Sequence, residues 1–154
     1  MDAIALLKED HKSLRALCEA FAETSESDTA ERRKLLARIE TELGAHTAIE
    51  EELFYPALLA ASKDVEDERM VAEGIEEHRA ADGKVIPDLH RADPSTVEYT
   101  GMAKVLKDYI FHHLKEEETD MFPRAKKLID RRELRSLGDK MVARKNELLG
   151  HMTV

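Results

Sequence analysis

The segments HTAIEEELFYP (residues 46–56) and HLKEEETDMFP (residues 113–123) are two versions of one pattern. Each copy begins with a histidine, carries a glutamate four residues later and ends with a proline. The shift between the copies is 67 residues, and the same shift also takes His11 to His78. The chain therefore contains an internal repeat in which each half supplies one histidine, followed by a His–Glu pair. The matched positions are His46 with His113, Glu50 with Glu117, and Pro56 with Pro123.

Apolar residues recur every three or four positions around these segments, which is the spacing of amphipathic helices. The pattern predicts four long helices at about 2–23, 28–61, 65–90 and 96–129, and a shorter one at about 130–149. Because proline removes a helical hydrogen bond, we expect Pro56 to kink or break the second helix and Pro123 to interrupt the fourth. The chain is thus predicted to be all-α, with a single domain over residues 1–154.

Composition argues against several classes of function. The formal net charge is −9, and acidic and basic residues are interspersed, whereas a nucleic-acid binder normally has a basic face. No apolar run approaches the roughly 20 residues that span a bilayer, and the first residues lack the features of a signal peptide. The single Cys18 cannot form an internal disulfide. We therefore expect a cytoplasmic protein without nucleic-acid or membrane partners.

The repeated histidines and glutamates indicate a metal site. Residues four apart on a helix lie on the same face, so each His–Glu pair can aim one nitrogen and one oxygen inward. Facing helices of this kind can enclose two metal ions bridged by carboxylates. Imidazole with carboxylate, and no pair of thiolates, suits iron or manganese, while zinc remains open. The predicted ligands are His11, His46, Glu50, His78, His113 and Glu117.

Several neighbouring residues have alternative interpretations. His112 competes with His113, because Glu116 also lies four residues after it, but the repeat favours His113. Tyr55 breaks the repeat, since Phe122 stands at the matching position; its phenol could bind iron, hydrogen-bond a ligand or plug the end of the bundle. The other acidic residues are expected either to form a solvated face or to hold ligand histidines. These residues are Glu51, Glu52, Glu116 and Glu118.

Four sequence elements, in this order, resemble the hemerythrin-like family of HHE cation-binding domains. They are EDHKSL around His11, HTAIEEELFYP, EEH at His78, and HLKEEETDMFP, and the resemblance covers roughly residues 1–129. It implies an antiparallel four-helix bundle over about 2–129, with an additional C-terminal helix at about 130–149. It also implies a cofactor of two iron ions, a non-haem di-iron centre that is oxo-bridged when oxidised. By position, the same six residues become the iron ligands.

One departure from the family pattern bears on function. Oxygen-carrying hemerythrins have a histidine four residues after the one matching His78, and here that residue is Asp82. Asp82 could ligate a metal or face solvent. Because oxygen ligands favour ferric over ferrous iron, such a site should carry oxygen reversibly less well and oxidise more readily. We therefore predict redox handling of small oxygen species, most concretely catalase-like decomposition of hydrogen peroxide.

Two other functions remain open at this point. The protein could be a non-catalytic binder that senses or stores oxygen, nitric oxide or iron, since one fold can host both roles. A metal-free helical adaptor would require all six placed residues to be coincidental. The last helix could cap the bundle or form a dimer contact, so a monomer and a homodimer are both open.

Overall fold

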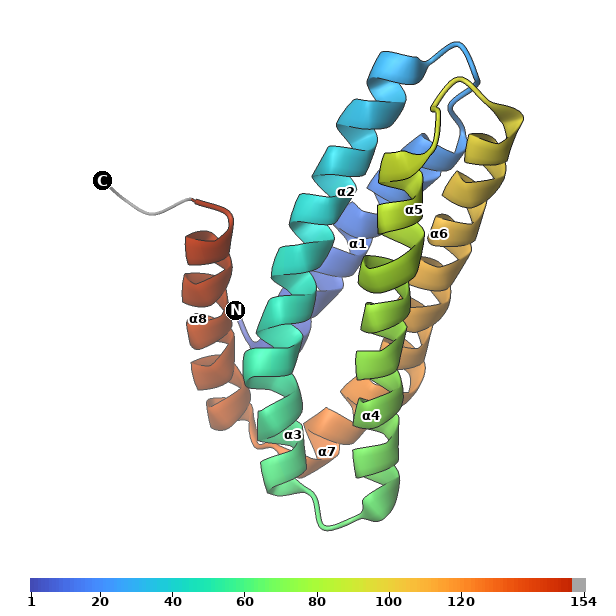
Figure 1. The fold of residues 1–154 in the computed structure, drawn as a ribbon. Coiled ribbons are helices and arrows are strands. Elements are labelled where there is room, and N and C mark those ends of the chain that lie inside the picture. The colour runs from blue at the N-terminus through green and yellow to red at the C-terminus, as the bar shows by residue number, and fades with distance from the viewer. Residues whose placement is uncertain (151–154) are drawn as a thin grey trace.

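The computed structural model describes residues 1–150, which contain only helices and connecting turns. Four antiparallel rods lie side by side, and the last helix packs outside them against α1 and α2 (Figure 1). This arrangement confirms the predicted all-α bundle with an additional C-terminal helix. None of the helices within residues 1–150 is both long and apolar enough to cross a bilayer. The first rod is α1 (Ala3–Ala22), and the second consists of α2 (Thr29–Ile49), η1 (Glu50–Phe54) and α3 (Tyr55–Ala61). The third consists of α4 (Val65–Ala80), η2 (Ala81–Val85) and α5 (Ile86–Arg91), and the fourth of α6 (Val97–Glu116), η3 (Glu117–Met121) and α7 (Phe122–Leu128). The helix outside the rods is α8 (Arg131–Leu148).

Three of the rods contain one wide π-helical turn, and each such turn begins six residues before a proline. In η1 the backbone N–H of Tyr55 donates to the carbonyl of Glu50, five residues earlier. The wider turn accommodates the following proline, whose ring would otherwise clash with a carbonyl of the preceding turn. Of the kink or break expected at Pro56, the break does not occur, because helical backbone continues through η1 and α3 to Ala61, the predicted end of this helix. The interruption expected at Pro123 is likewise a π-helical turn within a continuous rod.

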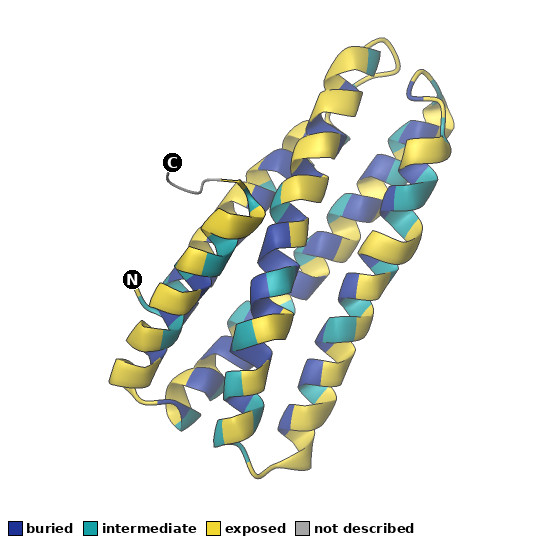
Figure 2. Cartoon of the chain, turned by 60° about the vertical axis from the view of Figure 1, so that its left-hand side comes forward, coloured by how far each residue is buried: buried dark blue, intermediate teal, exposed yellow. Residues whose placement is uncertain are grey.

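The rods bury their apolar faces toward one another (Figure 2), and the core has two parts. One cluster includes Leu14, Leu43 and Ile110, and the other includes Leu7, Ile49 and Met121. On each rod the two clusters are separated by a short stretch with buried polar residues. These are Asp10, His11, His46, Thr47, Glu50, His78, His113 and Glu117. The bundle therefore holds a polar layer between two apolar layers.

The last helix covers the bundle rather than standing apart from it. Leu134 and Met141 are buried, and a side chain at Gly138 would overlap the backbone that leads into α1. Farther along α8, the ammonium of Lys145 donates to Asp10 in the polar layer. Of the two predicted roles for this helix, the structure shows the capping contact.

Candidate metal centre

All six predicted ligands lie in the polar layer, and none is more than 5% exposed. Their donor atoms form two groups within which every atom lies within 4.8 Å of the others. Glu50 belongs to both groups: its Oε1 is 3.3 Å from Nε2 of His46 and 3.1 Å from Nε2 of His78. A carboxylate placed in this way can bridge two cations. The groups are His11, His46, Glu50 and Glu117, and Glu50, His78 and His113.

Each of the four histidines is oriented by a hydrogen bond to a carboxylate on another rod. In every case Nδ1 donates to a carboxylate oxygen, so Nε2 faces the middle of the bundle and can offer its lone pair to a metal once the imidazole is neutral. Of these partners, sequence reasoning missed Asp10 and Glu77, although each directly precedes a repeated histidine and the two match at the 67-residue shift. The pairs are His11 with Glu118 at 2.7 Å, His46 with Asp10 at 2.8 Å, His78 with Glu51 at 2.7 Å, and His113 with Glu77 at 2.7 Å.

The carboxylates in the polar layer favour the presence of cations there. Burial alone would lower the pKa of His46, but Glu50, Asp10 and Glu117 raise that pKa to about 10. Burial would likewise lower the pKa of His113, yet Glu50, Glu77 and Glu117 raise it to about 11. Excess carboxylate thus stabilises positive charge on the imidazoles. A bound metal cation would replace these protons, because ligand histidines must be neutral.

Two buried atoms support the fit of a metal to this site. Within the described residues, Nε2 of His46 and Oε2 of Glu50 have no hydrogen-bond partner. A buried polar atom without a partner costs about 1–3 kcal/mol, so such atoms require an explanation. Both belong to the predicted ligands. Coordination of a cation would satisfy both, and an imidazole–carboxylate donor set suits iron.

The repeat is broken at Tyr55, as the sequence indicated. Its hydroxyl donates to Oε2 of Glu117 at 2.9 Å and lies 3.4 Å from Nε2 of His78. At the matching position, the ring of Phe122 stacks on His11 with 5.3 Å between centroids. One end of the centre therefore carries a phenol and the other an apolar wall.

Gly74 provides the space for the Tyr55 hydroxyl. A Cβ at this position would lie 3.0 Å from the hydroxyl oxygen and 3.7 Å from Cε1 of His113. In the other half of the repeat the matching residue is the larger Leu7. Sequence reasoning missed Gly74, since a helical glycine by itself does not indicate which side chain it faces.

Substitution Gly74→Ala should lower the free energy of unfolding of the metal-free protein by about 1 kcal/mol, because it overpacks the buried Tyr55. Gly44→Ala is the matched control, since a Cβ at that helical glycine would meet no atom of another segment within 4 Å; it should stabilise by about 0.5–1 kcal/mol. Urea denaturation measures both changes. Because Tyr55→Phe also removes the hydrogen bond to Glu117, the cost of Gly74→Ala is measured with and without Tyr55→Phe. Gly74→Ala should cost less stability when Tyr55→Phe is present, and an equal cost in both backgrounds would contradict the assigned contact.

The remaining candidates lie outside the two donor groups. Asp82 is exposed, and its carboxylate belongs to neither group. His112 is 65% exposed and pairs with Glu116 at 2.9 Å, on the outer face of α6. Cys18 is buried, and burial raises the pKa of its thiol to about 12, which favours inert packing over reactivity.

Comparison with known proteins places this centre in a family. Uncharacterized proteins of Mycobacterium tuberculosis and Mycobacterium bovis are 32% identical over 151 residues, covering 97% of this chain and 89% of each relative. The crystal structure of a hemerythrin HHE cation-binding domain-containing protein from Mycobacterium kansasii superposes with a TM-score of 0.84. It is 32% identical, and the match covers 98% of this chain and 89% of that one. The family model described as hemerythrin HHE cation binding domain matches residues 2–125, and the chain therefore belongs to the hemerythrin HHE cation-binding family.

Proposed function

We propose that the protein holds two iron ions in the polar layer and decomposes hydrogen peroxide. The observation that carries the proposal is the pair of overlapping donor groups that share Glu50. His11, His46 and Glu117 would hold one ion with Glu50, and His78 and His113 would hold the other. The hydroxyl of Tyr55 contacts both groups, Glu117 of the first at 2.9 Å and His78 of the second at 3.4 Å, so it could serve as a further oxygen donor.

When bound, the irons would supply and accept the electrons that convert two molecules of hydrogen peroxide into one of oxygen and two of water. The protein itself would orient the site and limit access to it. Carboxylates from neighbouring rods hold all four imidazoles in one orientation. The Tyr55 hydroxyl donates a hydrogen bond at the centre, and burial together with the carboxylates of Glu50 and Glu117 raises its pKa, which keeps the phenol protonated in the absence of metal.

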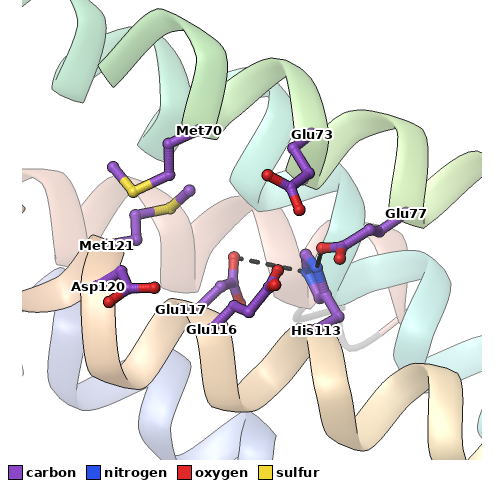
Figure 3. Close-up of a pocket in the computed structure, with 9 residues that line it drawn as sticks. Met70, Glu73, Glu77, His113, Glu116, Glu117, Asp120 and Met121 are labelled. Carbon is purple, nitrogen blue, oxygen red and sulfur yellow. Dashed lines mark hydrogen bonds and ion pairs between the residues drawn. The ribbon is translucent and has the colours of Figure 1, made fainter. Parts of the chain in front are cut away.

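A small cavity between α4 and α6 leads to the centre and would select small substrates. Its volume is about 70 Å³, and its lining runs from the exposed Glu73 and Asp120 to the buried His113 and Glu117 (Figure 3). The space is enough for about two water-sized molecules. Peroxide, oxygen and nitric oxide fit within it, whereas bulky substrates do not.

Oxygen release on addition of hydrogen peroxide, to protein whose iron content has been measured, tests the proposal. We expect rapid release from the native protein and a loss of at least about a hundredfold in Glu50→Ala, because that variant removes the shared ligand. Glu52→Ala is the matched control, since this neighbouring glutamate faces solvent and pairs with Arg144.

Native protein that holds about two irons per chain and releases no oxygen would overturn the catalytic proposal. It would favour the non-catalytic alternative, binding or storage of oxygen, nitric oxide or iron. Native protein that takes up no iron would overturn the metal centre as well.

A further inference from the structure

A third group of metal-ligating side chains lies at the mouth of the cavity, outside the centre. It consists of Glu77 on α4 and His112 and Glu116 on α6, whose donor atoms lie within 4.8 Å of one another. Nε2 of His112 is 2.9 Å from Oε1 of Glu116 and 3.8 Å from Oε2 of Glu77. We refer to these three residues as the mouth site.

Glu77 joins the mouth site to the centre. Its Oε1 accepts a hydrogen bond from Nδ1 of the buried His113, while its Oε2 faces His112 on the outside. Glu77 and Glu116 also line the cavity, whose inner wall includes His113 and Glu117 (Figure 3). A cation held at the mouth site would thus stand at the outer end of a passage to the buried ligands.

Comparison of the two halves of the repeat indicates that the mouth site would bind a cation. In the first half Asp10 matches Glu77: one of its oxygens holds His46, and the other accepts a hydrogen bond from the ammonium of Lys145. The outward oxygen of that carboxylate is therefore neutralised by a cation. In the second half, His112 and Glu116 face the outward oxygen of Glu77 instead.

The negative charge around the mouth site also favours the binding of a cation. Four carboxylates line the cavity near its opening, and within residues 1–150 none of them forms an ion pair with a lysine or an arginine. Carboxylates that have no lysine or arginine partner around an opening raise the local concentration of cations. A histidine among them adds the nitrogen ligand that distinguishes a transition-metal site from a general acidic surface. The four are Glu73, Glu77, Glu116 and Asp120.

We propose that Glu77, His112 and Glu116 form a loading site that binds ferrous iron at the surface and passes it through the cavity to the buried centre. The inference rests on the proposed iron centre. It assigns His112 and Glu116 a role in the rate of iron uptake and none in the final iron content. Three ligands from two helices, two of them partly exposed and His112 exposed, hold a cation less tightly than the buried groups, as a transit position requires.

The test is the time course of iron uptake. Metal-free protein is mixed anaerobically with Fe²⁺, a strong chelator stops uptake at intervals, and protein-bound iron is measured. His112→Ala and Glu116→Gln should each slow uptake by about tenfold, the effect of losing one group that holds a metal. Both variants should reach the iron content of the native protein.

Two control variants separate coordination from other effects. His90→Ala removes an exposed histidine that pairs with Glu40 at 3.1 Å on other helices, and it should leave the rate unchanged. Glu76→Gln removes an exposed carboxylate from the same helix that pairs with Arg79 and does not line the cavity, so it should change the rate by less than about twofold. Native rates in both His112→Ala and Glu116→Gln, with full final iron, would overturn the loading site and leave the centre intact. Absence of uptake in the native protein would overturn both.

Discussion

Replacement of His113 by alanine is expected to remove most of the bound iron, whereas replacement of its neighbour His112 should leave the final iron content unchanged. His113 is buried, its Nε2 lies 3.0 Å from Nε2 of His78, and Glu77 holds its other nitrogen. His112 lies on the outer face of the same helix. Loss of a group that only orients a ligand already lowers metal affinity by about 10–100-fold, so His113→Ala, which removes a proposed ligand, should fall well below the roughly two irons per chain proposed for the native protein.

Iron content after extensive dialysis, measured by elemental analysis, decides between the two histidines. His113→Gln provides a second variant that keeps much of the side-chain volume, and it should lose iron to a similar extent. Helix content measured by circular dichroism shows that the bundle has formed in each case. If His112→Ala alone empties the site, the repeat has been aligned one residue away from its correct register.

Replacement of Arg32 by methionine should lower the free energy of unfolding by about 3 kcal/mol or more. Arg32 is fully buried at the end of the bundle away from the last helix, and it donates to the carbonyls of Thr24 at 3.0 Å and Pro94 at 2.7 Å. It also donates to Oγ1 of Thr100 and lies over the ring of Tyr99. Methionine fills part of the space but leaves these acceptors without a donor, at about 1–3 kcal/mol for each one that stays buried.

Chemical denaturation of the metal-free protein measures this loss without a contribution from bound metal. Arg33→Met is the matched control, because the adjacent arginine is exposed, and it should change stability by less than about 0.5 kcal/mol. Equal stability of the two variants would mean that water replaces the lost donors of Arg32. For a chain of this length, 3 kcal/mol corresponds to a decrease in Tm of about 6–12 °C.

The repeat was sufficient to predict the bundle and the residues that meet at its centre. Hydrophobic spacing places His11, His46, His78 and His113 on inward faces, and a shift common to both halves distinguishes His113 from His112. The same shift contains a further signal, since Asp10 and Glu77 match as the histidines do. Two of the four carboxylates that orient the imidazoles could therefore have been found from the sequence.

Other features depend on contacts between distant segments that no local pattern indicates. Arg32 resembles its exposed neighbour Arg33 in sequence, and it becomes a buried donor because Thr24, Pro94 and Thr100, from other segments, supply acceptors around it. Lys145 reaches Asp10 from a helix that follows the repeat and has no counterpart within it. Gly74 has a role only because Tyr55 comes opposite it across the bundle. Each of these depends on how the rods are packed, which periodicity alone does not determine.

The three π-helical turns have a consequence for how this chain should be aligned with its relatives. A π turn amounts to one residue inserted into an α-helix, and one residue corresponds to about 100° of rotation about the helix axis. A relative that lacks η1 but keeps both His46 and Tyr55 facing inward must be one residue shorter between them. Single-residue gaps at Glu50–Phe54, Ala81–Val85 and Glu117–Met121 should therefore be accepted when relatives are aligned, because an ungapped alignment there would match inward residues of one protein with outward residues of the other.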